Sequence, residues 1–388
     1  MSKLKVAALQ GLSASSDAIT LANDGTCTAN LTNRTNRRLT INGAMLVAQR
    51  GTSFTASGSF PVDRFEVGHS GTDEAPTIAQ ADVASGTTPY TLGFRKCYKI
   101  TNGNQTGGAA SSDEIHISHK IEAQDLANSG WSYTSSSSFI TLSFWVKSSV
   151  AQEFHGFLYV PDGSAQLYSF SLGSLSADTW TKVTKTIPGN SNLTFNNDNG
   201  EGMNIRIACY KGSSTGSITQ NQWAAFNTNL RYPTYTSTWY TTNDATFEIT
   251  GVQLEVGDHA TDFEHRSFAQ ELALCHRYCY VIPVTSNDFL GNTSCYAHST
   301  TNIKGVFHFP QVMRTYPTYT GTNTAARGRA GNTSNNFDLD DISGGLGDST
   351  NPNPRAYGFT VTTSSMTGGQ AVLLEGQASG SITFDAEL

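Results

Sequence analysis

The chain has 388 residues, of which only 14% are charged, and it is rich in Ser, Thr and Gly. Such a composition favours many short strands over helices. The net charge of −7 and the pI near 5.7 argue against binding to nucleic acid or to an anionic membrane surface.

Residues 1–38 are polar and poor in core-forming side chains. Only KLKVAAL and AITLA could be strands there, and neither could bury a core alone. The opening MSKLKVAALQGL lacks the apolar region of a signal peptide, which predicts folding in a cytoplasm. No apolar stretch approaches the ~18 residues that a membrane span needs. Six Cys at irregular spacings predict free thiols rather than disulfides or a zinc site.

From residue 39 the pattern changes to apolar/polar alternation interrupted by Gly, Asn, Asp or Pro. Nine segments predict strands: LTINGAML (39–46), RFEVGH (64–69), YTLGFRKCYKI (90–100), FITLSFWVKS (139–148), EFHGFLYV (153–160), QLYSFSL (166–172), TWTKVTKTI (179–187), MNIRIACY (203–210) and ATFEITGVQLEV (245–256). Together they predict an all-β domain over residues 39–266, an antiparallel jelly-roll β-sandwich. Sequence periodicity over 20–50 residues is absent, which disfavours a solenoid.

The last of these strands changes register. Phe247 and Ile249 are apolar on odd positions, whereas Val252 and Leu254 are apolar on even positions. Gly251 lies at the switch, which predicts a β-bulge there.

A short helix is predicted over SFAQELALCHRYC (267–279), within a linker spanning residues 267–280. Apolar residues recur there at helical spacing, and Ser267 with Gln270 fits a capping box. Residues 281–388 return to the strand pattern and predict a smaller C-terminal β domain. Residues 326–356 within it are predicted to be a long polar loop.

An acidic and His-rich stretch, VQLEVGDHATDFEHRSF (252–268), is the first candidate site. His259 and His265 are too few for zinc, whereas Glu255, Asp258 and Asp262 could supply oxygens to calcium. Acids at a strand exit and before a helix N-terminus are also ordinary structural features. We favour a structural joint over a metal or catalytic site.

Hydrolytic chemistry finds no support in the sequence. There is no GxSxG elbow, and acid pairs such as Asp113/Glu114 or Asp340/Asp341 are not distinguished from other acids. The DLDD run (338–341) lacks the acid spacing of an EF-hand, so a solvated loop is the better interpretation. No catalytic residue, metal ligand or cofactor is predicted, and calcium remains unsupported.

An aromatic segment, NQWAAFNTNLRYPTYTSTWYTTND (221–244), has no strand alternation. Aromatic rings flanked by amides and hydroxyls suit sugar binding, because pyranose C–H groups lie on a ring face. We predict glycan-binding residues here: Trp223, Tyr232, Tyr235, Trp239 and Tyr240. The alternative is that the rings plug the end of the sandwich or a subunit interface. Trp145 and Trp180, in alternating strands, are predicted to be core residues.

Three stretches together resemble a group of phage structural proteins, the tail-fibre and head-fibre proteins of marine and cyanobacterial phages. They are INGAMLVAQRGTSFT (41–55), FEITGVQLEVGDHATDFEHRSFAQELALCHRYCY (247–280) and FHFPQVMRTYPTYTG (307–321), in the same order as in that group. One departure is Cys279, where relatives more often have Tyr. The likeness covers roughly residues 39–321.

The resemblance implies a carbohydrate-binding-module-like jelly roll displayed on a virion, with Trp223 on the loop before the VQLEVG strand. It also implies a homotrimer, attached to other virion proteins through residues 1–38, that adsorbs to host surface polysaccharide. We therefore expect a tail fibre that is not an enzyme, binds no nucleic acid, inserts into no membrane, and is assembled in the bacterial cytoplasm. The alternatives are a purely structural head or tail decoration protein and, third, a polysaccharide depolymerase.

Overall fold

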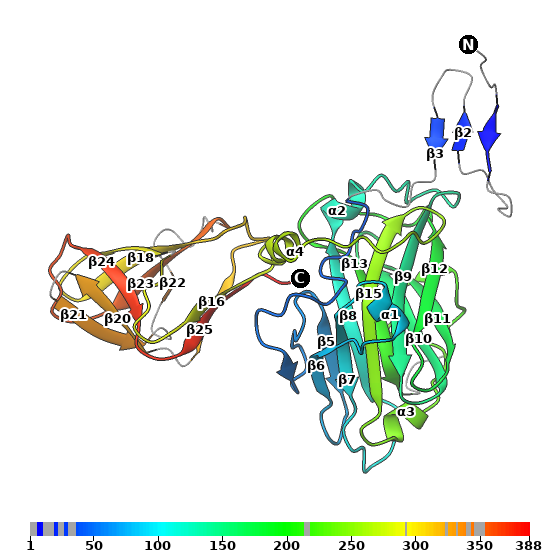
Figure 1. Ribbon diagram of the computed structural model, residues 1–388, viewed down its shortest axis with the longest axis horizontal. Helices are drawn as coiled ribbons and strands as arrows, with labels where there is room; N and C mark the ends of the chain where they lie inside the picture. The colour runs from blue at the N-terminus through cyan, green and yellow to red at the C-terminus, as the bar shows by residue number, and fades with distance from the viewer. Residues whose placement is uncertain are drawn as a thin grey trace.

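A computed structural model describes residues 6–10, 19–21, 27–29, 36–212, 218–291, 293–322, 325–330, 333–338, 343–344 and 354–388. The protein is all-β and is built from antiparallel sheets. Three short N-terminal strands, β1 (Ala8–Leu9), β2 (Ile19–Leu21) and β3 (Cys27–Ala29), stand apart from the rest of the chain (Figure 1).

Two six-stranded sheets form the central sandwich. The β9 sheet has the order β12 (Thr181–Pro188), β9 (Phe139–Ser148), β15 (Thr246–Val256), β7 (Lys96–Thr101), β6 (Thr77–Asp82) and β4 (Ser53–Phe54). The β10 sheet has the order β14 (Trp223–Ala225), β11 (Gln166–Leu175), β10 (Gln152–Val160), β13 (Glu201–Lys211), β8 (Glu114–Glu122) and β5 (Glu66–Ser70). One large buried cluster, from Met45 to Leu254, fills the space between them.

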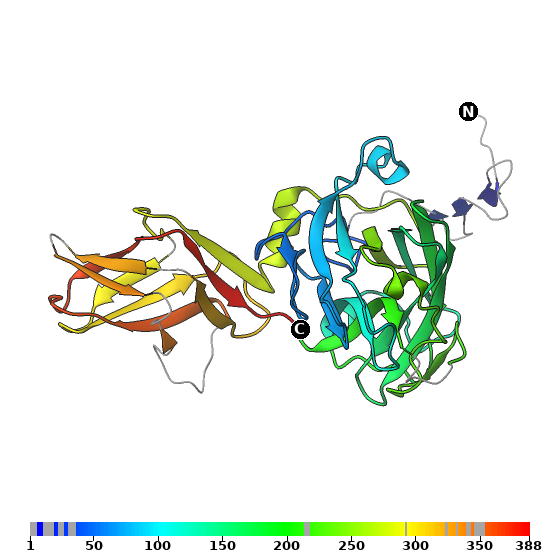
Figure 2. The ribbon, with the colours of Figure 1, turned by 90° about the horizontal axis from the view of Figure 1, so that it is seen from below.

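A C-terminal β unit follows, with its own buried cluster from Ile282 to Ala386. Its seven-stranded sheet has the order β21 (Thr333–Asp338), β20 (Ala325–Ala330), β24 (Ala371–Gly376), β17 (Thr293–Ala297), β18 (Asn302–His308), β23 (Ala356–Thr362) and β22 (Ser343–Gly344). A three-stranded sheet has the order β16 (Cys279–Val284), β25 (Gly380–Asp385) and β19 (Thr318–Thr322). Figures 1 and 2 show this unit and the sandwich side by side along the long axis, with α4 (Phe268–Cys275) between them.

Local sequence signals explain the helix between the two units. The Ser267 hydroxyl accepts the backbone N–H of Gln270, and the Gln270 side chain accepts the backbone N–H of Ser267, which is the predicted capping box. Three shorter helices also occur in the described chain: α1 (Thr88–Thr91), α2 (Ala123–Ala127) and α3 (Thr238–Thr241). None of the described helices is long and apolar enough to cross a bilayer.

Three sequence predictions are wrong in detail. The strand predicted over 90–100 begins only at Lys96, and α1 covers its first residues. Residues 39–46 form no strand, because Asn42 and Met45 have φ near +59° and the Asn42 side chain binds the backbone of Leu46, Val47 and Asp63 instead. The predicted loop over 326–356 contains most of β20 and all of β21 and β22. Residues 339–341, the last three of the DLDD run, lie outside the described residues.

The predicted bulge at Gly251 is confirmed. The pairing of β15 with β9 shifts register between Thr250 and Gln253, and Gly251 has φ +67°. A Cβ atom added to Gly251 would lie 2.7 Å from the ring of Phe94. The glycine therefore supplies both the left-handed backbone and the space for that ring.

We expect Gly251→Ala to lower the free energy of unfolding by about 2–4 kcal/mol, since it adds a clash to the cost of a left-handed backbone. Gly173→Ala is the matched control, because Gly173 has φ +87° with nothing within 4 Å of the added Cβ. Urea denaturation of both variants measures the difference. Equal losses would mean that contact with Phe94 contributes nothing.

Candidate functional site: an aromatic face beside a polar groove

Four of the five predicted glycan-binding rings are buried, which corrects that prediction. Tyr232, Trp239 and Tyr240 have no exposed surface, and Tyr235 is 9% exposed. A ring without exposed surface offers no face to a sugar. The alternative interpretation, that the rings plug the end of the sandwich, holds for Trp239 and Tyr240, whereas Tyr232 and Tyr235 cover the outside of a sheet.

The segment before α3 lies on the outer surface of the β10 sheet. Tyr232 packs on Phe157 with ring centroids 5.0 Å apart. The Tyr235 hydroxyl accepts the backbone N–H of His155 and lies 3.0 Å from the carbonyl oxygens of His155 and Ala208. These contacts cover strand positions that would otherwise face solvent.

Trp239 and Tyr240, in α3, close one end of the sandwich. The Trp239 indole donates to the carbonyl of Thr246 at 3.0 Å, and Tyr240 stacks on Tyr210 with centroids 4.3 Å apart. Trp223 is half-buried, and it lies in β14 rather than in the loop that the resemblance implied. Its indole donates to Pro188 of the β9 sheet at 2.7 Å, so it joins the two sheets at their edge.

Trp145 and Trp180 were predicted to be core residues, and this is also wrong: both are only half-buried. The even positions of β9, such as Leu142, Phe144 and Val146, are buried between the sheets, so Trp145 points outward. The sequence carried this signal, because Trp145 shares its parity with Ser143 and Lys147.

The outward positions of four strands align in two rows. Register places Lys182, Trp145 and Thr250 side by side, and Cys97 adjoins the last pair of β15 with β7, Ile249 with Tyr98; Thr250 and Cys97 are both buried. The second row holds Lys147, Glu248 and Lys99, and the Trp180 ring lies 5.4 Å from the Lys147 ammonium. We call these two rows, with Trp180, the aromatic face.

A pocket of about 260 Å³ adjoins Trp145. Phe94 and Phe263 meet edge to face with centroids 4.9 Å apart, and the His265 ring lies 5.1 Å from Phe94. Leu92, at the pocket margin, is 51% exposed. The bulge at Gly251 makes this pocket, because it admits the Phe94 ring over the strand.

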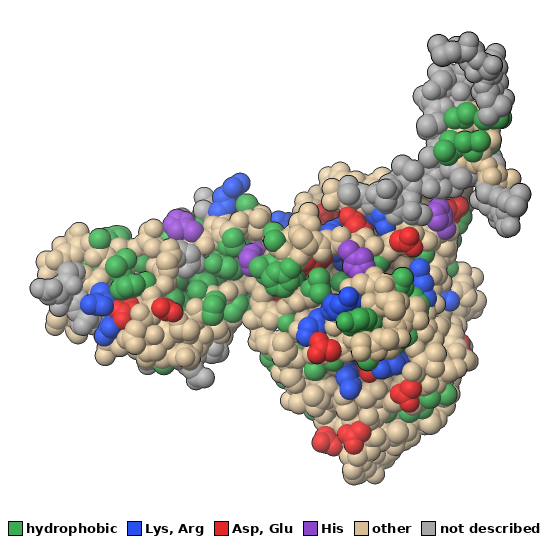
Figure 3. Space-filling view, viewed as in Figure 1, with side chains coloured by type: hydrophobic (Ala, Val, Ile, Leu, Met, Phe, Trp, Pro, Cys, Tyr) green, Lys and Arg blue, Asp and Glu red, His purple; other side chains and the backbone are tan. Residues whose placement is uncertain are grey.

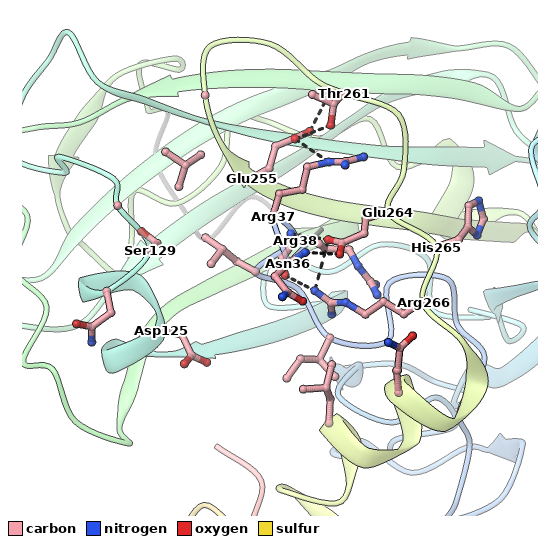
Figure 4. Close-up of a pocket in the computed structure, with 18 of the residues that line it drawn as sticks. Asn36, Arg37, Arg38, Asp125, Ser129, Glu255, Thr261, Glu264, His265 and Arg266 are labelled. Carbon is pink, nitrogen blue, oxygen red and sulfur yellow. Dashed lines mark hydrogen bonds and ion pairs between the residues drawn. The ribbon is translucent and has the colours of Figure 1, made fainter. Parts of the chain in front are cut away.

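A larger polar groove of about 1370 Å³ shares Thr261 and His265 with that pocket. Figure 4 shows residues 36–38, the loop before α4 and α2 around it, with Asp125 and Ser129 on the α2 side. Most of the residues that line it carry amide, hydroxyl or charged groups, and Leu39, Ile41 and Leu274 add apolar surface. The groove contains the stretch 252–268 that the sequence singled out.

The carboxylates of that stretch make structural contacts. Glu264 accepts the backbone N–H groups of Asn36 and Arg38, and Glu255 accepts Thr261 and pairs with Arg37 at 3.4 Å. Burial acts to raise the pKa of Glu264, but these backbone donors and nearby arginines outweigh it and hold the pKa below its ordinary value. The stretch is a joint, as predicted.

The joint continues into α4 through a buried ion pair. Glu271 accepts the Arg38 guanidinium and the backbone N–H of Asn42, and both side chains of the pair are at most 1% exposed. Asn42 is the second residue of the INGAML motif, and Glu271 belongs to the 247–280 motif. Two of the three stretches behind the resemblance therefore meet here.

A second set of contacts holds the C-terminal unit. Arg64 binds Glu387 and lies 3.4 Å from the centroid of the Tyr278 ring, while Arg277 binds Glu122 at 2.6 Å. We call these contacts, with the Arg38–Glu271 pair, the polar joint.

The described residues bring no three His, Cys, Asp or Glu side chains together as a metal site would need. Asp258 and His259 form an exposed pair at 2.8 Å. Glu114 is a buried ion-pair centre: burial opposes its ionisation, but His116, Arg231 and Arg206 lower its pKa to about 2. Such a carboxylate stays ionised and suits a structural role better than that of a general acid.

No family model matches the chain, and no curated protein matches it. Among solved structures it is similar to the enzymatically active domain of bacteriophage CBA120 tailspike protein 4, with 11% identity, TM-score 0.31, 57% of this chain covered and 21% of that one.

Two carbohydrate-binding domains are also similar. The N-terminal cellulose-binding domain of β-1,4-glucanase C from Cellulomonas fimi has 10% identity and TM-score 0.27, with 55% of this chain and 100% of that one covered. The family 11 module from Clostridium thermocellum, solved with a β-1,3-1,4-linked tetrasaccharide, has 10% identity and TM-score 0.24, with 55% and 98% covered.

We expect Glu271→Gln to lower the free energy of unfolding by about 3 kcal/mol, because it leaves the buried Arg38 charge uncompensated. Asp82→Asn is the control, since the Asp82–Lys96 pair is exposed and should contribute almost nothing. Thermal and urea denaturation measure both. A Glu271→Gln protein as stable as the control would show that this pair does not hold the joint.

The polar joint should also weaken in acid. Burial acts to raise the pKa of Glu122, yet hydrogen bonds from Arg277 and Tyr278 lower it below 4.5. A lowered folded-state pKa stabilises the protein above pH 4.5, and this stability is lost as pH falls through the folded value. Denaturation from about pH 6 to about pH 3 should show a smaller acid loss in Glu122→Gln than in the wild type. The same dependence of stability on pH in the variant and the wild type would contradict this.

Proposed function

We propose that the protein is a non-catalytic virion protein that binds glycan on the bacterial surface through the aromatic face. The proposal rests on one observation: Trp145 and Trp180 are half-buried rings on the outer side of the β9 sheet, with Lys182 beside Trp145 and Lys147 beside Trp180. Rings of this kind bind the C–H face of a sugar while polar neighbours bind its hydroxyls. The site differs from the one predicted at residues 221–244.

The phage assignment rests on the three motifs in residues 41–55, 247–280 and 307–321. We propose a tail fibre that acts as a homotrimer, attaches to other virion proteins through residues 1–38 and adsorbs to host polysaccharide. The chain would be made in the host cytoplasm and end on the virion, with no cofactor. Exposed Leu9 and Leu21 on the N-terminal strands are in keeping with such contacts.

A head or tail decoration protein is the second candidate, because the polar joint is a structural feature that either function would need. Cryo-electron microscopy of intact virions distinguishes the two. A decoration role requires the aromatic face to be covered by neighbouring virion proteins, whereas adsorption requires it to be open.

The glycan proposal predicts that Trp145→Ala with Trp180→Ala weakens binding to host polysaccharide by about tenfold or more, since both apolar ring faces that would contact the sugar are removed. Tyr296→Ala is the control, because Tyr296 is a 44% exposed ring on the C-terminal unit. Glycan arrays and calorimetry on the purified protein measure binding, and circular dichroism checks folding. Unchanged binding by the double variant would remove the aromatic face from the site.

A further inference from the structure

We propose that the aromatic face selects acidic polysaccharides, whose sugars carry carboxylate or sulfate groups. This inference rests on the glycan-binding function proposed above and specifies its ligand. The aromatic face carries several lysines, whereas the whole chain has a net charge of −7.

Basic side chains gather on the aromatic face. Figure 3 shows Lys and Arg side chains around hydrophobic ones on the sandwich surface near α1. Lys182 lies opposite Trp145, and Lys99 and Lys147 flank Glu248 in the second row. Arg95 stacks on Tyr90, with its guanidinium carbon 4.0 Å from the ring centroid.

The acid within the two rows does not neutralise this charge, although the exposed Asp262 lines the pocket beside Lys182. Glu248 pairs with Lys147 at 3.1 Å and is only 8% exposed, so it offers little charge to a ligand. Among the described residues, neither Lys99 nor Lys182 forms an ion pair, and Lys182 is exposed. Two lysines therefore remain available to bind anionic groups.

Their spacing suits a polymer rather than a single sugar. Lys182 and Lys99 lie on strands separated by β9 and β15, about 14 Å apart at the usual distance between neighbouring strands. Trp145, on β9, lies between these two strands, and Trp180 lies just before β12. A chain of sugars crossing the strands would meet a lysine, two indole rings and a second lysine.

The combination of positive and negative side chains on and beside the aromatic face favours an acidic glycan over nucleic acid as the ligand. Nucleic-acid sites combine stacking rings with a continuous positive groove that neutralises many phosphates. Here the positive charge is confined to a few lysines beside Glu248, and the adjoining groove contains Asp125, Glu255, Asp258 and Glu264. Sparse lysines match sparse carboxylates or sulfates better than one phosphate per nucleotide.

The experiment compares pairs of polymers that share a sugar backbone and differ in whether that backbone carries charged groups. Polygalacturonate and its fully methyl-esterified form share one backbone, as do dextran sulfate and dextran. Binding of the full chain to each is measured by calorimetry at low salt and at about 0.15 M salt, where exposed charges are screened beyond about 8 Å. A thymidine oligonucleotide is measured alongside.

We expect an acidic polymer to bind more tightly than its neutral partner, with the advantage shrinking in salt. Lys99→Gln with Lys182→Gln should lower affinity for the acidic polymer by about threefold to tenfold and leave the neutral one unchanged. Lys304→Gln, on β18 of the C-terminal unit, is the matched control. Trp145→Ala should weaken both polymers.

The outcomes separate the two proposals. Equal, tryptophan-dependent binding of charged and neutral polymers would overturn the charge preference while keeping glycan binding. Failure of all four polysaccharides and of host polysaccharide to bind would overturn both. Tighter, lysine-dependent binding of the oligonucleotide would replace the acidic glycan with nucleic acid.

Discussion

The buried contact of Glu271 with Arg38 and the backbone of Asn42 is the interaction on which the rest of the architecture depends. It lies where the residue 36–43 segment, the last strand of the sandwich and α4 converge. Burying a charge is costly unless it is paired and hydrogen-bonded, so this arrangement tolerates few alternatives. The groove follows from it, because residues 36–39 form one wall only while Glu264 and Glu271 hold them.

The same strand that leads into the joint also shapes the aromatic face. β15 changes register at Gly251, which keeps apolar side chains inward in both halves of the strand. The bulge leaves room for Phe94 above the sheet, and Phe94 in turn supports Phe263 and His265. A conformational requirement of the core thus creates the pocket beside Trp145.

Much of the fold was predictable from local signals, whereas most of the candidate site was not. Gly251 and the Ser267–Gln270 capping box act within a few residues, so their patterns are readable in sequence. Tyr232 and Tyr235 belong to a segment that folds back on strands about 75 positions earlier, and nothing local reports such burial. Composition alone suggested solvent-exposed rings there, but tertiary packing buries them.

Trp145 and Trp180 were misjudged for a different reason. On β9, Trp145 shares its parity with Thr141, Ser143 and Lys147, whereas Ile140, Leu142, Phe144 and Val146 have the other parity. Period-two alternation therefore placed Trp145 on the solvent side, and general hydrophobicity wrongly placed it in the core; Trp180 lies just before β12 rather than within a strand. Two large rings kept on the polar side of a sheet forgo burial that the core could have provided. A surface held in this way by a rigid joint is suited to recognition, because the protein orders the rings before any ligand arrives.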